Sequence, residues 1–146
     1  MSVSNPPRGY HSICPYLLIT DVPKMIDFLV RAFGAIEKER HERPDGSIGH
    51  AEVKIGDSIV MMGGVSGEWK SMEASVFIYI DDADAAYARA LAAGATSVME
   101  PSLQYYGDRM GGVRDPFGNL WWVATHVEDV SPEEMAARSR AQQQRA

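Results

Sequence analysis

The same order of strand and helix signals occurs twice along this chain, once in each half of the sequence. Four matching residue pairs stand sixty positions apart, namely Asp21 with Asp81, Ala32 with Ala92, Gly34 with Gly94, and Ala35 with Ala95. Four matches at one offset, in the same order of elements, indicate an internal duplication. Two copies are too few for a solenoid, so the duplication predicts a pseudo-symmetric pair of units.

The first copy is predicted to contain one helix and four strands. Residues 13–20 are apolar and indicate a strand, and Asp21 is placed to cap the helix that follows. Apolar residues at helical spacing continue to Gly34, which is expected to end this helix. Strands are expected at 36–43 and 47–55, around the turn Pro44-Asp45-Gly46, and at 58–62. A glycine-containing loop over 63–72 carries Trp69.

The second copy repeats this order and completes an α+β fold of two tandem βαβββ modules. The expected elements are a strand at 75–80, a helix at 83–93, and strands at 96–100, 109–114 and 120–125. We therefore expect one domain over residues 10–127, with modules at about 13–63 and 73–126, after a flexible arm over 1–9.

The tail over 128–146 is predicted to be helical. Ser131-Pro132-Glu133-Glu134 is a capping box with proline at the first helical position, so a helix is expected from Pro132 to about Arg140. The last five residues, QQQRA, are expected to fray. Three placements of the helix are open: against the domain, against a partner subunit, or in solvent.

Composition excludes several classes of function. The formal net charge of −6 disfavours nucleic-acid binding, which needs a basic surface. The chain has no apolar run long enough to span a membrane, and its N-terminus lacks the apolar segment of a signal peptide. The single cysteine, Cys14, rules out an intramolecular disulfide. A cytoplasmic location is therefore expected.

An ordered set of segments extends over nearly the whole chain: PYLLITD (15–21), AFGA (32–35), PDGSIGHAEVKIGDS (44–58), AGA (93–95) and YGDRMGGVRDPFGNLWWVATHVEDVSPEEM (106–135). Together they resemble the vicinal oxygen chelate superfamily, which comprises glyoxalase I, bleomycin-resistance proteins and extradiol dioxygenases, and within it the PhnB-like branch. The resemblance implies two sheets that are covered by helices on one side and form a curled mixed half-barrel on the other. A small-molecule site inside the half-barrel is expected.

The resemblance also implies where a metal would bind. Metal-dependent members use four strand residues, usually His or Glu, which correspond here to Cys14, Val60 or Met61, Ser75, and Trp122. None of these residues is His, Asp or Glu, so the family's metal chemistry is not expected here, and neither is a cofactor.

The expected site is instead aromatic. Strand alternation and the resemblance together predict a set of ligand-binding residues: Cys14, Tyr16, Met61, Trp69, Ser75, Phe77, Tyr79, Tyr106, Arg109 and Trp122. Phe77 and Trp122 have the alternative of filling the core. Arg109 is either a clamp for a carboxylate or phosphate, or the partner of Asp108 in fixing a loop.

Three residues are candidates for acid–base chemistry. His50 and Glu52 are two apart on one strand and share a face, so they form a metal-ligand pair, a base with its orienting carboxylate, or surface polarity. Asp108 is the third candidate.

Three classes of function follow from these residues. The favoured one is a homodimeric, metal-free protein that binds a small aromatic or hydrophobic molecule without transforming it. The second is a lyase, isomerase or dioxygenase-type enzyme that uses His50 and Glu52. The third is an interaction module, which the length of the chain disfavours.

Overall fold

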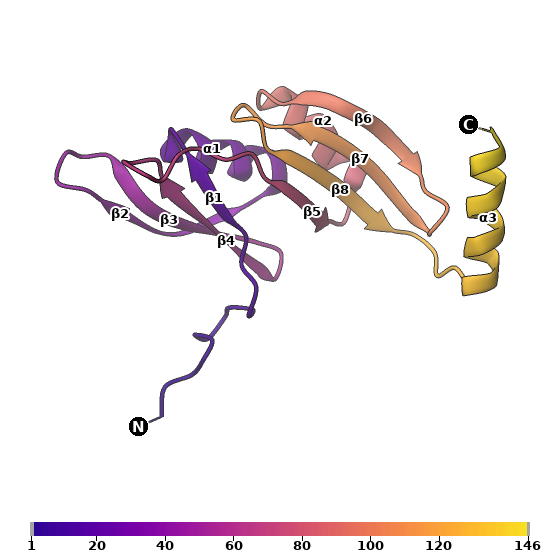
Figure 1. The fold of residues 1–146 in the computed structure, drawn as a ribbon, viewed down its shortest axis with the longest axis horizontal. Helices are drawn as coiled ribbons and strands as arrows, with labels where there is room; N and C mark the ends of the chain where they lie inside the picture. Colours follow the sequence, from indigo (N-terminus) through magenta and orange to yellow (C-terminus); the bar gives the residue numbers. More distant parts are fainter. Residues whose placement is uncertain (1, 146) are drawn as a thin grey trace.

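Two open four-stranded sheets form the body of the protein in the computed structural model, which describes residues 2–145. The first sheet has the order β1-β4-β3-β2 and contains β1 (Tyr16–Ile19), β2 (Ile36–Glu42), β3 (Ile48–Ile55) and β4 (Ser58–Gly64). The second has the order β5-β8-β7-β6 and contains β5 (Ser75–Tyr79), β6 (Thr96–Leu103), β7 (Asp108–Arg114) and β8 (Leu120–His126). Only the β1–β4 and β5–β8 pairs are parallel. The predicted α+β fold of two βαβββ modules is confirmed (Figure 1).

The helix of each module is capped at its start by an aspartate, and a glycine with positive φ follows its end. Asp21 caps α1 (Val22–Phe33) by accepting a hydrogen bond from the amide of Lys24, and Gly34 follows in the left-handed conformation with φ 68°. Asp82 caps α2 (Ala83–Ala92) in the same way. The structural equivalent of Asp21 is therefore Asp82, one position after the residue that the sixty-residue offset matches with it.

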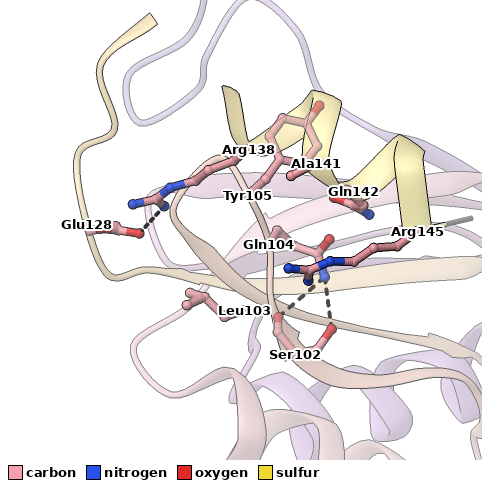
Figure 2. Close-up of a pocket in the computed structure, with 9 residues that line it drawn as sticks. All are labelled: Ser102, Leu103, Gln104, Tyr105, Glu128, Arg138, Ala141, Gln142 and Arg145. Atoms are coloured by element: carbon pink, nitrogen blue, oxygen red, sulfur yellow. Dashed lines mark hydrogen bonds and ion pairs between the residues drawn. The ribbon is translucent and has the colours of Figure 1, made fainter. Parts of the chain in front are cut away.

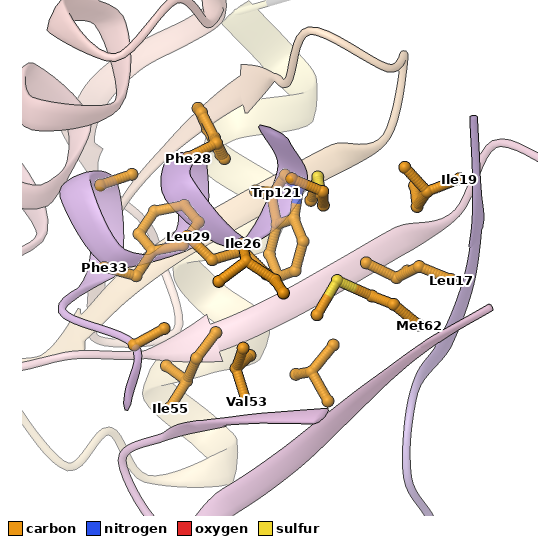
Figure 3. Close-up of a cluster of buried hydrophobic side chains, with 14 of the residues drawn as sticks. Leu17, Ile19, Ile26, Phe28, Leu29, Phe33, Val53, Ile55, Met62 and Trp121 are labelled. Atoms are coloured by element: carbon orange, nitrogen blue, oxygen red, sulfur yellow. The ribbon is translucent and has the colours of Figure 1, made fainter. Parts of the chain in front are cut away.

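One hydrophobic core connects the two modules. Helices α1 and α2 contact each other and cover the same side of the two sheets (Figure 1). Apolar side chains from α1 and the strands meet there, with Trp121 of β8 close to α1 (Figure 3). The rings of Phe33 and Trp121 have centroids 5.3 Å apart, and Trp121 is completely buried. The modules are therefore joined by packing as well as by the chain.

The ends of some elements differ from their predicted positions. Strand β1 begins at Tyr16 rather than Ile13. Strand β6 continues past Glu100 to Leu103, because shifts of its register against β7 accommodate Pro101. The tail helix α3 (Pro132–Arg145) is longer than predicted. Alanine, arginine and glutamine favour helix throughout its last turns.

Each sheet leaves one side free of α1 and α2, which is called here the helix-free face. On β4, Val60 and Met62 belong to the core, whereas Met61 and Gly63 alternate with them and point to the helix-free face. Within the described residues, none of the helices has the length and apolar character needed to cross a membrane. Met1 and Ala146, at the ends of the predicted arm and tail, lie outside these residues.

Candidate functional site

The helix-free face of the first sheet carries an aromatic ring that lies against a glycine. Tyr16 of β1 is 52% exposed although it lies within a sheet. A Cβ atom added to Gly63 would lie 2.7 Å from the Tyr16 hydroxyl oxygen and 2.9 Å from Cε1 of its ring. The missing side chain at Gly63 therefore allows this ring to lie close against β4, where its outer face is available for stacking.

The second sheet repeats this arrangement with a larger ring. Trp122 of β8 lies against Gly112 of β7, where an added Cβ would lie 2.7 Å from the indole. The indole N–H of Trp122 donates to the Ser75 hydroxyl at 3.0 Å, which fixes the orientation of the ring. Phe77 and Tyr79 lie on the same face with their ring centroids 5.2 Å apart, and both are exposed. Neither Phe77 nor Trp122 is part of the core cluster.

His50 and Glu52 are brought together on β3, and Glu52 is also hydrogen-bonded by Tyr10. His50 Nε2 lies 2.8 Å from Glu52 Oε2, and Tyr10 from the N-terminal segment donates its hydroxyl to Glu52 Oε1. Lys38 donates to the same Tyr10 hydroxyl at 2.6 Å. Burial acts to raise the pKa of Glu52, but hydrogen bonds from His50 and Tyr10 outweigh it and leave that pKa below its ordinary value. Glu52 is thus a hydrogen-bonded anion under the Tyr10 side chain.

Asp108 is the buried centre of a second polar cluster. Its carboxylate accepts from the Tyr79 hydroxyl at 3.0 Å and contacts His126 Nδ1 at 2.8 Å. The other ring nitrogen of His126 contacts Asp129 at 2.8 Å. Hydrogen bonds to Asp129 and Asp108 raise the pKa of His126, and the bond to Asp108 raises the pKa of Tyr79.

His126 was not a candidate in the sequence. It faces Asp108 across the β7–β8 ladder, and this register joins positions 18 apart in the chain. The turn between β7 and β8 indicates that these strands pair, and from that pairing the contact of His126 with Asp108 could have been inferred.

The remaining candidates lie in separate places. Arg109 points to the side covered by α2, where its Nε donates to Asp84 at 2.9 Å, so it does not face Tyr16 or Trp122. Tyr106 donates to the sulfur of Met110 at 3.5 Å, and burial raises its pKa. Cys14 precedes β1 and donates to the carbonyl of His11 at 3.5 Å.

A cavity of about 300 Å³ opens beside Tyr16 on the first sheet. Its lining residues are Tyr16, Leu18, Arg43, Gly49, Gly63, Gly64 and Trp69. Trp69 is 69% exposed and comes from the connection between β4 and β5. A cavity of this volume is at the lower end of the range for small-molecule sites, and its mixture of aromatic and few polar groups is typical of them. Arg43 and the glycines were not candidates in the sequence.

A larger cavity, of about 520 Å³, lies between α3 and the β6–β7 connection (Figure 2). Side chains of α3, including Gln142 and Arg145, project toward residues 102–105. Arg138 joins α3 to Glu128 through an ion pair. None of the predicted ligand-binding residues lines this cavity.

The duplicated modules, with one helix-covered side and one free side, are shared with a known family. The model of the Glyoxalase/Bleomycin resistance protein/Dioxygenase superfamily matches residues 11–123. The chain belongs to this superfamily. An uncharacterized protein from Mycobacterium tuberculosis is 36% identical over 142 residues, which cover 90% of this chain and 84% of that protein.

Solved structures with a similar fold are consistent with this assignment to the superfamily. TioX from Micromonospora sp. ML1 is 31% identical, with a TM-score of 0.68, over 79% of this chain and 98% of that chain. A gene product from Arabidopsis thaliana is 26% identical, with a TM-score of 0.64, over the same shares of the two chains.

The residues at the superfamily's metal positions do not fit a metal ion here. Met61 pairs with Tyr16 as Trp122 pairs with Phe77, so Met61 rather than Val60 is the equivalent of Trp122. An indole N–H is only a donor, and a thioether and a hydroxyl are poor replacements for imidazole and carboxylate, so Cys14 is the single ordinary metal ligand of the set. Among residues 2–145, no group of three or more His, Cys, Asp or Glu side chains is placed to hold a metal ion.

Proposed function

We propose that this protein binds a small, flat aromatic or hydrophobic molecule on its helix-free face and uses no metal of the superfamily type. The observation that carries this proposal is the exposed Tyr16 ring, which lies against Gly63 beside a cavity of about 300 Å³ with Trp69 in its lining. Exposed rings beside a cavity offer stacking surfaces, and a bound flat molecule would remove them from water.

A titration of the protein with a panel of uncharged flat aromatic compounds, 2-naphthamide among them, tests this proposal. Isothermal titration calorimetry is expected to find saturable binding of at least one compound. Trp69→Ala should weaken that binding by about two- to tenfold, since an aromatic stacking contact contributes about 0.5–1.5 kcal/mol. His41→Ala is the control, because His41 is exposed on β2 and does not line the cavity. No binding by any compound, or equal losses in both variants, would contradict the proposal.

A second candidate is a lyase, isomerase or dioxygenase-type enzyme. The observation that favours it is the bonding of buried Asp108 to both Tyr79 and His126, because such a chain of polar groups is suited to moving a proton. The predicted enzymatic pair of His50 and Glu52 is less suited to this role, since Tyr10 already occupies Glu52. Recovery of the bound compound unchanged after incubation would favour binding, whereas its conversion would favour the enzyme.

We also propose that the protein belongs to the PhnB-like branch of the superfamily, is located in the cytoplasm and forms a homodimer. Light scattering of the purified protein tests the homodimer directly.

A further inference from the structure

A positively charged side chain lines the cavity beside Tyr16. Arg43 follows β2, is half-buried, and lines this cavity together with Tyr16 and Trp69. Among residues 2–145, Arg43 has no carboxylate within ion-pair distance. The nearby Asp45 directs its carboxylate to the backbone amide and hydroxyl of Ser47, at 2.9 and 2.6 Å. Arg43 is therefore a half-buried cation that forms no ion pair, although its charge is one of the causes that lower the pKa of Asp45.

Two glycines, Gly49 and Gly64, leave space for the Arg43 side chain beside the sheet. An added Cβ at Gly49 would lie 3.2 Å from Arg43 Nε, and one at Gly64 would lie 3.2 Å from Nη1. The guanidinium donates through Nη2 to the carbonyl of Gly64 at 2.8 Å and through Nη1 to the Ser47 hydroxyl at 3.4 Å. These two bonds use two of the five N–H groups of the guanidinium, so donors remain for a two-pronged bond to a carboxylate.

Trp69 is positioned by a short turn that β1 anchors on both sides. Ser66 and Trp69 exchange backbone hydrogen bonds at 3.0 and 2.9 Å. On one side of this turn Val65 donates to the carbonyl of Ile19, and on the other side Met72 bridges to Leu18. Trp69 and Tyr16 therefore come from connected segments of the first module, and both line the cavity that contains Arg43.

We infer that this cavity selects a flat aromatic molecule that carries a carboxylate. The ring of the molecule stacks on Tyr16 and Trp69, and its carboxylate binds the guanidinium of Arg43. This inference rests on the proposed function and adds to it a requirement for negative charge. It also gives Arg43 the carboxylate-binding role that the sequence suggested for Arg109, whose guanidinium is instead paired with Asp84.

A pair of probes of equal shape separates the charge requirement from aromatic binding. Calorimetry measures the affinity of the wild-type protein for 2-naphthoate and for its uncharged counterpart 2-naphthamide. We expect 2-naphthoate to bind at least tenfold more tightly. In Arg43→Gln the two affinities should come within twofold of each other, through a loss of 2-naphthoate binding alone.

Arg140→Gln is the matched control. It removes the same charge from an exposed position on α3, which lies at the far end of the molecule from the first module (Figure 1). It should retain the tenfold preference. If Arg43→Gln fails to fold, which circular dichroism will show, Arg43→Lys replaces it. Lysine keeps the charge but cannot form the two-pronged bond, so the preference should fall below tenfold.

The outcomes distinguish the inference from the proposed function. Equal affinities for both probes in the wild-type protein would overturn the charge requirement and leave aromatic binding in place. A preference for 2-naphthoate that persists unchanged in the Arg43 variant would also overturn it. Absence of binding by both probes would overturn the inference, and absence of binding by every other compound of the panel as well would contradict the proposed function.

Discussion

Asp115 shows how much one buried side chain organises in this protein. Its carboxylate accepts hydrogen bonds from the backbone amides of Phe117 and Asn119, at 2.8 and 3.0 Å. It also accepts from the Asn119 side chain at 2.9 Å and from the indole of Trp121 at 2.8 Å. The turn before β8 and the indole in the core are thus held by the same two oxygen atoms. The Asp-Pro-Phe-Gly-Asn segment therefore has a structural role.

Replacement of Asp115 by alanine is expected to destabilise the protein by about 2–4 kcal/mol, because it leaves several buried donors without an acceptor. Chemical denaturation measures this free energy of unfolding. Asp27→Ala is the control, because its exposed carboxylate forms only an ion pair with Arg31 on the same helix, and such a pair contributes less than about 1 kcal/mol. Similar losses in the two variants would show that the Asp115 bonds do not stabilise the fold.

At the scale of elements, His126 connects three parts of the second module. It ends β8, contacts Asp108 at the start of β7, and contacts Asp129 in the segment that leads to α3. Both contacts favour the charged imidazolium, which is why the pKa of His126 is raised. The attachment of this segment to the sheet should therefore depend on pH.

The sign of this dependence follows from the raised pKa. A folded-state pKa above the unfolded value near 6.5 means that the stabilisation is complete below that value and is lost as the pH rises through the higher, folded one. The difference in Tm between the wild-type protein and His126→Gln should thus be largest near pH 5.5 and decrease toward alkaline pH. Asp129→Asn should reduce this dependence, since Asp129 is one of the two carboxylates that raise the pKa of His126. A difference that stays constant with pH would contradict the assignment.

Local sequence signals were sufficient to predict the ends of the helices but not those of the strands. The aspartate and glycine signals located α1 and α2 correctly, because capping and left-handed conformations depend on nearby residues. The end of β6 was not predicted, because Pro101 indicates a break whereas pairing with β7 continues beyond it. Strand ends depend on the neighbouring strand, which lies outside any local window of sequence.

At the scale of the whole molecule, small residues allow the two modules to approach each other. Ala86 and Ala90 of α2 are completely buried within the core cluster that also contains residues of α1. Reciprocal bonds cross the junction: Arg89 donates to the carbonyl of Ala32 at 3.2 Å, and Arg31 donates to the carbonyl of Ala92 at 3.4 Å. The relative position of the two helix-free faces depends on this junction.

Ala90→Leu should therefore destabilise the protein by about 1–3 kcal/mol, because its extra methyl groups have no space between α2 and the core. Ala88→Leu is the matched control on the same helix, where the side chain is exposed, and it should change stability by less than about 0.5 kcal/mol. Thermal and chemical denaturation measure the stability of both variants. A larger loss in the Ala88 variant would mean that the junction is not tightly packed.

The sequence by itself determined the duplication, the fold class and the caps of the helices, because these depend on periodicity and on local backbone chemistry. The resemblance to the superfamily also implied which residues stand at its metal positions. Only the tertiary structure showed which residues meet. It paired His126 with Asp108 across a ladder, directed Arg109 away to Asp84, and placed Arg43 beside Tyr16 and Trp69. Such contacts depend on strand register and on the space left by glycines, which join residues distant in the chain.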